Sequence, residues 1–507
     1  MMSKQRYFLS AFAALTVFVG SAAASQPSPQ NKRAPTPTKP PQIANELDNE
    51  LSALITQFGI TGHVAGQSSA PNINDPIPQL GMQLFFSKAL GGEKSVACAS
   101  CHHPKLGGGD SLSLPIGVNA IDADTVGLSR QAMNDEIDIP RNSPTIFNVG
   151  LATKALFWDG RVEQVSQEDE AGNVSTFIST PDSGFGLADS NAGDSLVEAL
   201  SRFPVTSVQE MRGSAFNDAQ TNDDVRSHLA QRIGDYGVES GGLATNAWLA
   251  EFRKAFNSEA DAPSLITFDS IDLALGQYQS SLTLVDNNWN RYVKGNKNAL
   301  KPAQKRGAKL FFTQAAEGGA GCVNCHGGER FTNDGFFNLA FPQYGIGKND
   351  DNADLGRGLI DPQIQNQFAF RVPSLLNIEL TAPYGHAGAY ETLEQVVAHY
   401  VDPETAIDAF FERGGACGLK QFAQSSQCEL LNANARVNSQ AALTLLQSSP
   451  FVAAPLDSAQ QKDLVAFLRA LTDNCAKDKR CLQKWIPGPK TVDPDNLRLN
   501  VLSRHKG

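Results

Sequence analysis

The chain has 507 residues, a formal net charge of −11 and a pI of about 5.3. This length leaves room for two or three domains. The acidic balance excludes an electrostatic case for binding nucleic acid or an anionic membrane surface. Composition therefore sets bounds, and the chemistry has to come from the motifs.

The first 24 residues have the pattern of a secretory signal peptide. Lys4 and Arg6 precede a mostly apolar stretch at 7–20, and small residues follow at 22–24. An uncleaved membrane anchor is the alternative, but the apolar stretch is short for a membrane span. We therefore expect export to the periplasm, with no membrane span after cleavage.

Residues 25–44 are rich in Pro, Ser, Lys and Gln, which predicts a disordered linker. A helix is expected to begin near Asn45, because four apolar residues recur there at helical spacing. They are Leu47, Leu51, Leu54 and Ile55.

Two copies of Cys-x-x-Cys-His are the main chemical signal. One is Cys98-Ala99-Ser100-Cys101-His102, and the other is Cys322-Val323-Asn324-Cys325-His326. Two thiols three residues apart can bond both vinyl groups of one haem, and the adjacent His can bind its iron. A redox Cys pair and a zinc site are the alternatives, but the first needs no trailing His and the second seldom splits its halves so widely. The motifs predict two covalently bound haem c groups.

An internal repeat accompanies these motifs. The sequence Gly-x-x-Leu-Phe-Phe begins at Gly81 and again at Gly307, shortly before each haem motif. It predicts a mainly α protein with two cytochrome-c-like haem domains and long loops. The expected domains are 45–295 with the first haem and 296–486 with the second, followed by a tail at 487–507. Helices are expected at 271–292, leading to the junction, and at 463–471.

Four cysteines are not used by the haem motifs. They are Cys417, Cys428, Cys475 and Cys481. An even number in an oxidising compartment suggests two disulfides. Three pairings are open, and proximity in sequence favours Cys417 with Cys428 and Cys475 with Cys481.

The positions of Met and His in the sequence limit which residues can be axial ligands of the two haem irons. No Met occurs after Met211, so the second haem has no Met ligand from its own domain. No His occurs between His103 and His228, which leaves an open sixth position at the first haem as one interpretation. Closure by a distant ligand, such as Met133 or His228, is the other.

Several further segments resemble the bacterial di-haem cytochrome c peroxidase and MauG family. Three matching blocks lie in the first half of the chain: Leu-Phe-Phe from Leu84, Pro-Arg-Asn-Ser-Pro-Thr from Pro140 and Phe-Trp-Asp-Gly-Arg from Phe157. Three more lie in the second half: Phe-Arg-Val-Pro-Ser-Leu from Phe370, Thr-Ala-Pro-Tyr-Gly-His from Thr381 and Thr-Leu-Glu-Gln from Thr392. The resemblance covers roughly residues 75–165, 200–215, 270–400 and 456–475. It implies that the first haem reacts with peroxide and that the second relays electrons.

The resemblance also points to one branch of this family. Where the ordinary peroxidases carry a distal His after the first motif, this chain has Val118, which cannot bind iron. Where they carry a Met ligand to the second haem, this chain has Tyr400, as MauG does. A phenolate is expected to lower the potential of the second haem. The alternative for Tyr400 is simple packing at a helix end.

The resemblance implies roles for five more residues. Glu210 would be the distal acid that moves protons of peroxide, and Trp158 would assist electron transfer between the haems. Asn142, with the backbone carbonyls of Thr381 and Pro383, would bind a calcium ion. The alternatives are a surface Glu, a core aromatic residue and a turn without metal. His386 is expected to be structural and near the second haem, and His399 is expected to be a surface or core residue.

The expected function is a MauG-like peroxidase or oxidase, which takes hydrogen peroxide and oxidises a periplasmic electron-donor or substrate protein. A detoxifying cytochrome c peroxidase with a small cytochrome or copper protein as donor is the alternative. A non-catalytic electron-transfer cytochrome is a third. Two insertions relative to the family, 166–203 and 413–450, are either docking surfaces or loop decoration.

Overall fold

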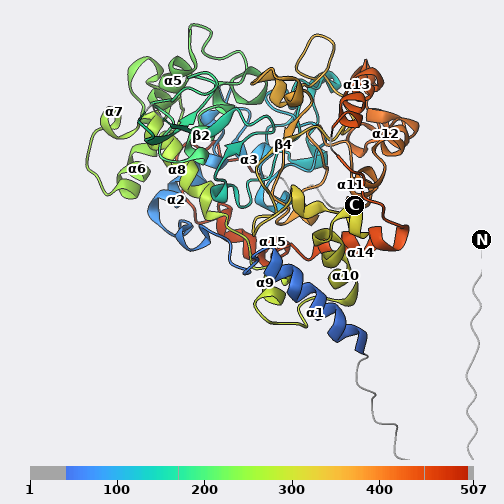
Figure 1. The fold of residues 1–507 in the computed structure, drawn as a ribbon. Coiled ribbons are helices and arrows are strands. Elements are labelled where there is room, and N and C mark those ends of the chain that lie inside the picture. Colours follow the sequence, from blue (N-terminus) through green and yellow to red (C-terminus); the bar gives the residue numbers. More distant parts are fainter. Residues whose placement is uncertain (1–41, 169–170, 450, 501–507) are drawn as a thin grey trace, which may run out of the picture. The chain divides into compact units, whose positions relative to one another are not determined.

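Helices provide most of the regular structure in the computed structural model, which describes residues 42–168, 171–449 and 451–500 (Figure 1). This confirms the prediction of a mainly α protein with long loops. The predicted signal peptide, nearly all of the predicted linker and residues 501–507 lie outside the described residues. Within the described part of the chain, no helix is both long and apolar enough to cross a membrane.

The α-helices in chain order are α1 (Gln42–Gln57), α2 (Pro76–Phe86), α3 (Cys98–Cys101), α4 (Leu196–Ser201), α5 (Asn222–Gly234), α6 (Trp248–Phe256), α7 (Ala262–Leu265), α8 (Phe268–Ser281), α9 (Asn288–Val293), α10 (Pro302–Phe312), α11 (Leu393–Val401), α12 (Pro403–Glu412), α13 (Ala435–Gln447), α14 (Ser458–Arg469) and α15 (Asn474–Lys477). The strands are β1 (Ala155–Leu156), β2 (Val162–Glu168), β3 (Val174–Ser179), β4 (Phe336–Phe337) and β5 (Phe370–Arg371). They form an antiparallel sheet in the order β1-β2-β3 and a separate antiparallel pair, β4-β5.

The helix that precedes each haem motif crosses a partner helix at a glycine. A Cβ atom on Gly81 of α2 would lie 1.9 Å from the carbonyl oxygen of Ala274 in α8. One on Gly307 of α10 would lie 1.9 Å from the carbonyl oxygen of Asp463 in α14. Only a residue without a side chain permits so close an approach. The Gly-x-x-Leu-Phe-Phe repeat thus marks two equivalent helix crossings.

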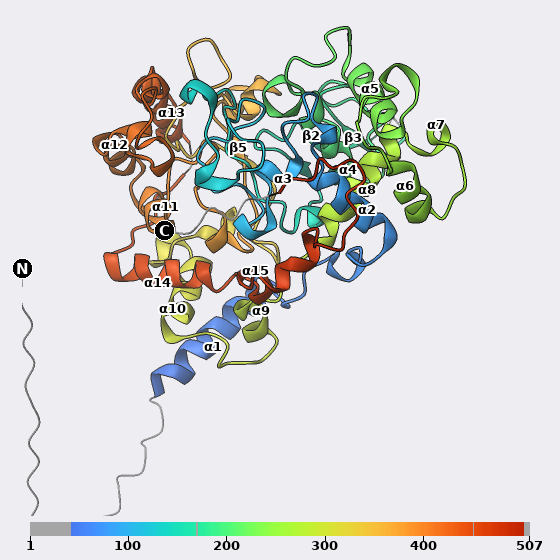
Figure 2. The same cartoon turned by 180° about the vertical axis from the view of Figure 1, so that it is seen from behind.

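Two large hydrophobic clusters form most of the core, one beside each haem motif. The cluster near the first motif contains Phe85 of α2, and the cluster near the second contains Phe311 of α10. Each end of the described chain packs in the cluster beside the haem motif that is more distant in sequence. Leu51 of α1 packs in the second cluster, whereas Trp485 and Leu499 pack in the first. Figures 1 and 2 both show α1 beside α10, far from it in sequence.

The helix expected at 271–292 is interrupted, because α8 ends at Ser281 and α9 begins at Asn288. The cause is a tertiary contact. The side chain of Asn148 accepts a hydrogen bond from the Leu284 amide at 2.6 Å and donates one to its carbonyl at 3.0 Å. These groups are therefore not available for helical pairing.

The insertion at 166–203 contains a hairpin that composition did not predict. Strands β2 and β3 pair from Glu163 with Ser179 to Glu168 with Val174. Much of the hairpin is exposed, so its stability comes from backbone pairing and not from an apolar pattern that the sequence would reveal.

Candidate functional site

The first Cys-x-x-Cys-His motif forms a single helical turn, α3, with His102 directly after it. The Nδ1 atom of His102 lies 3.4 Å from the carbonyl oxygen of Gly108. Burial lowers the pKa of His102, which favours the neutral imidazole. A neutral ring whose Nδ1 faces a backbone carbonyl offers Nε2 to a metal. Both thiols, Cys98 and Cys101, are unpaired, so the motif fits a covalent haem.

Val118 and Glu210 are brought together beside this motif. The amide of Val118 donates to the carbonyl oxygen of Gln209 at 3.2 Å, and Gly117 packs against the carbonyls of Gln209 and Glu210. Cys101 lies within electrostatic range of Glu210. The structure thus places both predicted residues near the first motif.

Glu210 lies on a short π-helical turn, Val208–Arg212, and its own amide donates to the hydroxyl of Ser207, the N-cap residue, at 3.3 Å. Burial raises the pKa of Glu210, and the positive charges of Arg161 and Lys348 partly oppose this. A carboxyl whose pKa is raised in this way takes up and releases its proton at a higher pH than an ordinary Glu, which suits it to proton transfer.

Neither of the distant residues considered as ligands for the first haem is oriented as one. The side chain of Met133 is 50% exposed. His228 is flanked by Asp218 and Glu239, with each ring nitrogen 3.5 Å from a carboxylate oxygen.

The second motif opens onto a cavity of about 1380 Å³, lined by Cys322, Cys325, His326 and Tyr400. This is larger than the roughly 300–1,000 Å³ of most small-molecule sites and can accept a porphyrin. The Nδ1 atom of His326 lies 3.0 Å from the carbonyl oxygen of Phe331, and burial lowers the pKa of His326 to about 4. The donor set therefore fits a haem here as well.

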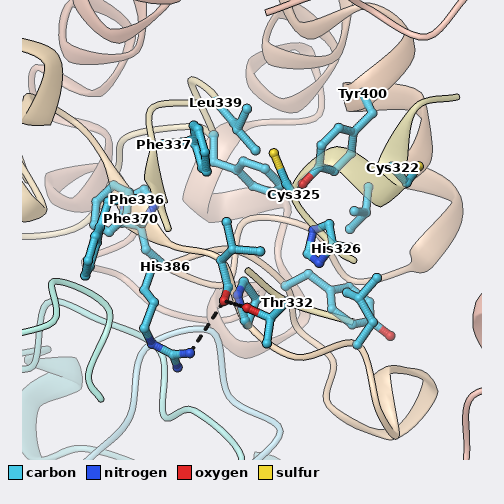
Figure 3. Close-up of a pocket in the computed structure, with 18 of the residues that line it drawn as sticks. Cys322, Cys325, His326, Thr332, Phe336, Phe337, Leu339, Phe370, His386 and Tyr400 are labelled. Atoms are coloured by element: carbon cyan, nitrogen blue, oxygen red, sulfur yellow. Dashed lines mark hydrogen bonds between the residues drawn. The ribbon is translucent and has the colours of Figure 1, made fainter. Parts of the chain in front are cut away.

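Tyr400 belongs to α11, which begins with a capping box. The Thr392 hydroxyl accepts from the amide of Gln395, and the Gln395 side chain accepts from the amide of Thr392. This cap starts the helix that carries Tyr400 to the cavity. Figure 3 shows Tyr400 and His326 turned into the same space beside Cys325. Burial raises the pKa of the Tyr400 phenol, so only a bound cation would make it ionise at neutral pH.

The other two histidines near this cavity have structural partners. His386 stacks on Phe370 at 3.9 Å between ring centroids, and its Nε2 accepts a hydrogen bond from the side-chain amide nitrogen of Gln343 at 3.2 Å. His399 has both ring nitrogens occupied, by the hydroxyl of Tyr390 at 2.8 Å and the carbonyl of Leu339 at 2.7 Å.

Trp158 and Asn142 both line this cavity and contact each other. The indole N–H of Trp158 donates to the backbone carbonyl of Asn142 at 2.8 Å. The side-chain amide of Asn142 donates to the carbonyls of Leu112 and Ser113 at 2.8 and 3.3 Å. This fixes the amide nitrogen and leaves the Asn142 side-chain oxygen as an acceptor.

Thr381 and Pro383 line the same cavity as Asn142. The three residues can offer one side-chain oxygen and two backbone carbonyls, which are donors that suit a hard cation. Nothing in the donor set suits a soft metal.

Arg161 and Lys348, which flank Glu210, were not predicted as site residues. Arg161 ends the Phe-Trp-Asp-Gly-Arg block, so its position in that block was a usable signal. Lys348 comes from a loop about 140 residues further along the chain, and its sequence carries no signal. Burial, together with the charges of Arg141 and Arg161, lowers the pKa of Lys348 to about 8.

The predicted disulfide pairing is confirmed, with Cys417 bonded to Cys428 and Cys475 bonded to Cys481. All four cysteines outside the haem motifs are therefore used.

Comparison with known proteins agrees with this site. The family model for di-haem cytochrome c peroxidase matches residues 77–298. The methylamine utilization protein MauG of Methylorubrum extorquens is 29% identical over 360 residues, covering 71% of this chain and 77% of that protein. Cytochrome c551 peroxidase of Pseudomonas aeruginosa is 26% identical over 360 residues, covering 70% and 79%.

A solved structure of a MauG-like protein associated with microbial copper homeostasis has the same fold, with a TM-score of 0.51 and 21% identity. The match covers 84% of this chain and 96% of that one. With both haem motifs, these matches confirm the resemblance noted in the sequence. The chain is thus similar to the di-haem cytochrome c peroxidases, and the family model and these relatives indicate a peroxidase-type oxidoreductase with two c-type haems.

Proposed function

We propose that this protein is a MauG-like enzyme that takes hydrogen peroxide at the first haem and draws electrons from a protein or other donor through the second. The observation that carries this proposal is that Val118 is bonded to Gln209, the neighbour of Glu210, and that Glu210 lies within electrostatic range of Cys101 in the first motif. A side chain that cannot bind iron is thus close to a half-buried carboxyl, so peroxide can enter without displacement of a ligand.

The haems supply the redox chemistry when bound, and the residues of the chain supply binding and proton transfer. We assign Cys98, Cys101 and His102 to the first haem, and Cys322, Cys325, His326 and Tyr400 to the second. An ionised Glu210 accepts a proton from hydrogen peroxide and returns it to the leaving oxygen, which departs as water. The charges of Arg161 and Lys348 favour the ionised carboxylate that this step needs.

Trp158 is proposed to assist electron transfer between the two haems. Its ring lines the cavity of the second motif, and the same segment carries Arg161, which lies within electrostatic range of Glu210. One short segment of chain thus connects both sites. A substrate that gives up electrons can then dock at the surface, without reaching either iron.

We also propose a calcium ion held by Asn142, Thr381 and Pro383. The fixed orientation of the Asn142 amide supports this assignment. Removal of calcium with a chelator should lower thermal stability, and added Ca²⁺ should restore it. In an Asn142→Ala variant the chelator should have no further effect. An equal chelator effect in both proteins would contradict the assignment.

We propose a periplasmic location after removal of residues 1–24. The two disulfides support it, because such bonds persist in oxidising compartments. Cell fractionation and N-terminal sequencing of the mature protein test this.

A detoxifying cytochrome c peroxidase is the second candidate, because relatives with that name match at similar identity. A non-catalytic cytochrome is the third and is disfavoured by Val118 at the first motif.

The test is to add one equivalent of hydrogen peroxide to the fully ferric protein, without reductant, while following both haems spectroscopically. Rapid loss of both ferric signals, followed by slow recovery, is the expected result. A reaction that begins only after one haem is reduced would favour the activation-dependent peroxidase.

A further inference from the structure

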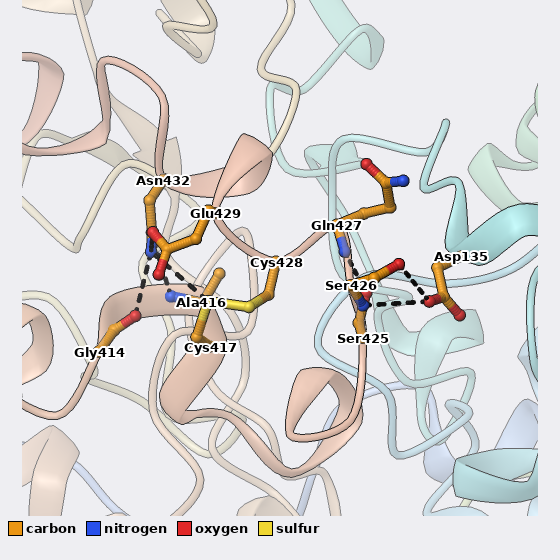
Figure 4. The surroundings of a disulfide bond; sticks show 10 residues. All are labelled: Asp135, Gly414, Ala416, Cys417, Ser425, Ser426, Gln427, Cys428, Glu429 and Asn432. Carbon is orange, nitrogen blue, oxygen red and sulfur yellow. Dashed lines mark hydrogen bonds between the residues drawn. A yellow bond between two sulfur atoms is a disulfide. The ribbon is translucent and has the colours of Figure 1, made fainter.

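The second insertion carries a short loop closed by a disulfide. This loop, residues 417–428, is called here the disulfide loop. It contacts residues 114–135 of the first half of the chain, called here the distal segment, which contains Val118. Figure 4 shows the disulfide and one of the contacts between the two segments.

The first contact joins Gln421 to Leu114. The Gln421 side-chain oxygen accepts from the Leu114 amide at 3.0 Å, and its side-chain nitrogen donates to the Leu114 carbonyl at 2.7 Å. Both backbone groups of Leu114 are thus paired by one side chain, as a neighbouring strand would pair them. Leu114 is four residues before Val118.

The second contact lies at the other end of the distal segment. The amide and the hydroxyl of Ser426 donate to one carboxylate oxygen of Asp135, at 3.2 and 3.3 Å (Figure 4). Two parts of the distal segment are also bonded to each other, since the Met133 amide donates to the carbonyl of Asn119 at 2.8 Å. The disulfide loop therefore holds both ends of the distal segment.

A buried arginine holds the backbone of the distal segment between these two contacts. Arg130 is 2% exposed and donates to the carbonyls of Ile116 and Gly117 at 2.7 and 2.8 Å. The next residue, Val118, donates to the carbonyl of Gln209, the neighbour of Glu210. Hydrogen bonds to backbone groups thus hold Leu114, Ile116, Gly117 and Val118, from the contact with Gln421 to the bond between Val118 and Gln209.

We propose that Gln421 is a positioning residue for the distal side of the first haem, and that the Cys417–Cys428 disulfide holds Gln421 in place. This inference rests on the proposed function, because it takes the distal side to be where peroxide enters. The disulfide loop contains only short helical turns, Gly415–Gly418 and Lys420–Phe422. The covalent closure is therefore the main restraint on its conformational freedom.

The test compares two glutamines of the same loop in the haem-loaded protein. Gln421→Ala removes both bonds to Leu114. Gln427→Ala is the matched control, because the Gln427 side chain makes no hydrogen bond within the described residues (Figure 4). Hydrogen exchange at the Leu114 amide and the rate of cyanide binding to the ferric first haem are measured in each.

Gln421→Ala should speed hydrogen exchange at Leu114 about five- to tenfold, as expected for the loss of one or two hydrogen bonds. It should also change the cyanide association rate severalfold, whereas Gln427→Ala should change neither. A merely structural Gln421 would lower thermal stability and leave the cyanide rate unchanged. Cyanide rates that agree between the two variants would overturn the proposal.

A double-mutant cycle tests the role of the disulfide. Cys417→Ser/Cys428→Ser should reproduce much of the effect of Gln421→Ala on cyanide binding, and adding Gln421→Ala to it should change little. Fully additive effects would show that the disulfide does not act through Gln421. Hydrogen exchange at the Leu114 amide does not involve Glu210, and the cyanide rates are compared between two variants that both keep Glu210. A failure of this proposal is therefore distinguishable from a failure of the proposed function.

Discussion

The indole N–H of Trp158 donates a hydrogen bond of 2.8 Å to the backbone carbonyl of Asn142. The backbone amide of Asn142 in turn donates to the backbone carbonyl of His386 at 2.8 Å. Trp158 is thus bonded to the residue whose side-chain oxygen is proposed to bind calcium. The orientation of this tryptophan and the occupancy of the cation site should depend on each other.

Replacement of Trp158 by Phe should weaken the connection between the two haems. The variant keeps an aromatic ring but leaves the Asn142 carbonyl without its partner, at a cost of about 1–3 kcal/mol in the free energy of unfolding. After peroxide is added, the signal of the second haem should change more slowly than in the wild type. Trp485→Phe is the control, because it also loses one indole hydrogen bond, to Ser281. Equal kinetics in the two variants would exclude a special role for Trp158.

Replacement of Glu210 by Gln should slow the reaction with peroxide by a factor of about 10²–10⁴, the usual contribution of a proton-transfer group. Because burial raises the pKa of Glu210, the wild-type rate should fall as pH decreases through a value above the ordinary Glu pKa. This acid limb should be missing in the Gln variant. Stopped-flow rates across a pH series measure both effects, with exposed Glu259→Gln as control. An undiminished rate in Glu210→Gln would rule out the catalytic assignment.

Replacement of Lys348 by Met should move this acid limb to higher pH. The positive charge of Lys348 lowers the pKa of Glu210, so its removal leaves the carboxyl protonated over a wider range. The pKa of Lys348 itself is lowered to about 8, so its charge is present on the acid side, where the limb is measured. Lys420→Met, at an exposed position, should leave the limb in place. A limb that does not move would show that Lys348 has no influence on Glu210.

Local patterns in the sequence predicted the parts of the site that one segment can specify. Each haem motif and the capping box at Thr392 depend on residues close in sequence, and each is recognisable there. The Gly-x-x-Leu-Phe-Phe repeat is recognisable too, but the helix crossings at Gly81 and Gly307 involve partner helices distant in sequence. The same holds for the two disulfides, whose cysteines are close in sequence.

The parts that could not be predicted depend on contacts between distant segments. Lys348 acts electrostatically on Glu210, and Gln421 bonds Leu114, although neither pair is close in sequence and no periodic pattern indicates the pairing. The break between α8 and α9 has the same origin, since its cause is a pair of hydrogen bonds to Asn148. Tertiary contacts here override the local preference for helix.

Replacement of Tyr400 by Phe should alter the spectrum of the second haem and raise its reduction potential. An anionic oxygen ligand stabilises oxidised iron, and Phe cannot supply one. Tyr384→Phe is a matched control in the same cavity, because the Tyr384 hydroxyl is already bonded to the carbonyl of Ile378 at 3.0 Å. Redox titration with optical detection measures both variants. An unchanged second-haem spectrum in Tyr400→Phe would exclude this tyrosine as a ligand.

Replacement of Asp354 by Asn should destabilise the protein strongly. Arg141 binds both oxygens of Asp354, at 2.6 and 2.7 Å, and also pairs with Asp159, and all three side chains are buried. Disruption of a buried ion pair leaves an incompletely paired charge and costs about 3–5 kcal/mol. Asp463→Asn is the matched control, since Asp463 makes the same two-point contact with the half-exposed Arg306. Because the side chain of Arg306 is 53% exposed, this ion pair should contribute only about 0–1 kcal/mol to the free energy of unfolding.

This ion pair should also govern stability in acid. Burial alone would raise the pKa of Asp354 and Asp159, but Arg141 holds both below the ordinary value. Because their folded-state pKa is lower than the unfolded one, they stabilise the fold above about pH 4, and this stabilisation is lost as pH falls below that value. The difference in unfolding free energy between wild type and Asp354→Asn should therefore shrink from pH 7 to pH 3, as measured by urea denaturation. A difference that is constant with pH, or equal costs for Asp354→Asn and Asp463→Asn, would show that Arg141 does not stabilise these carboxylates.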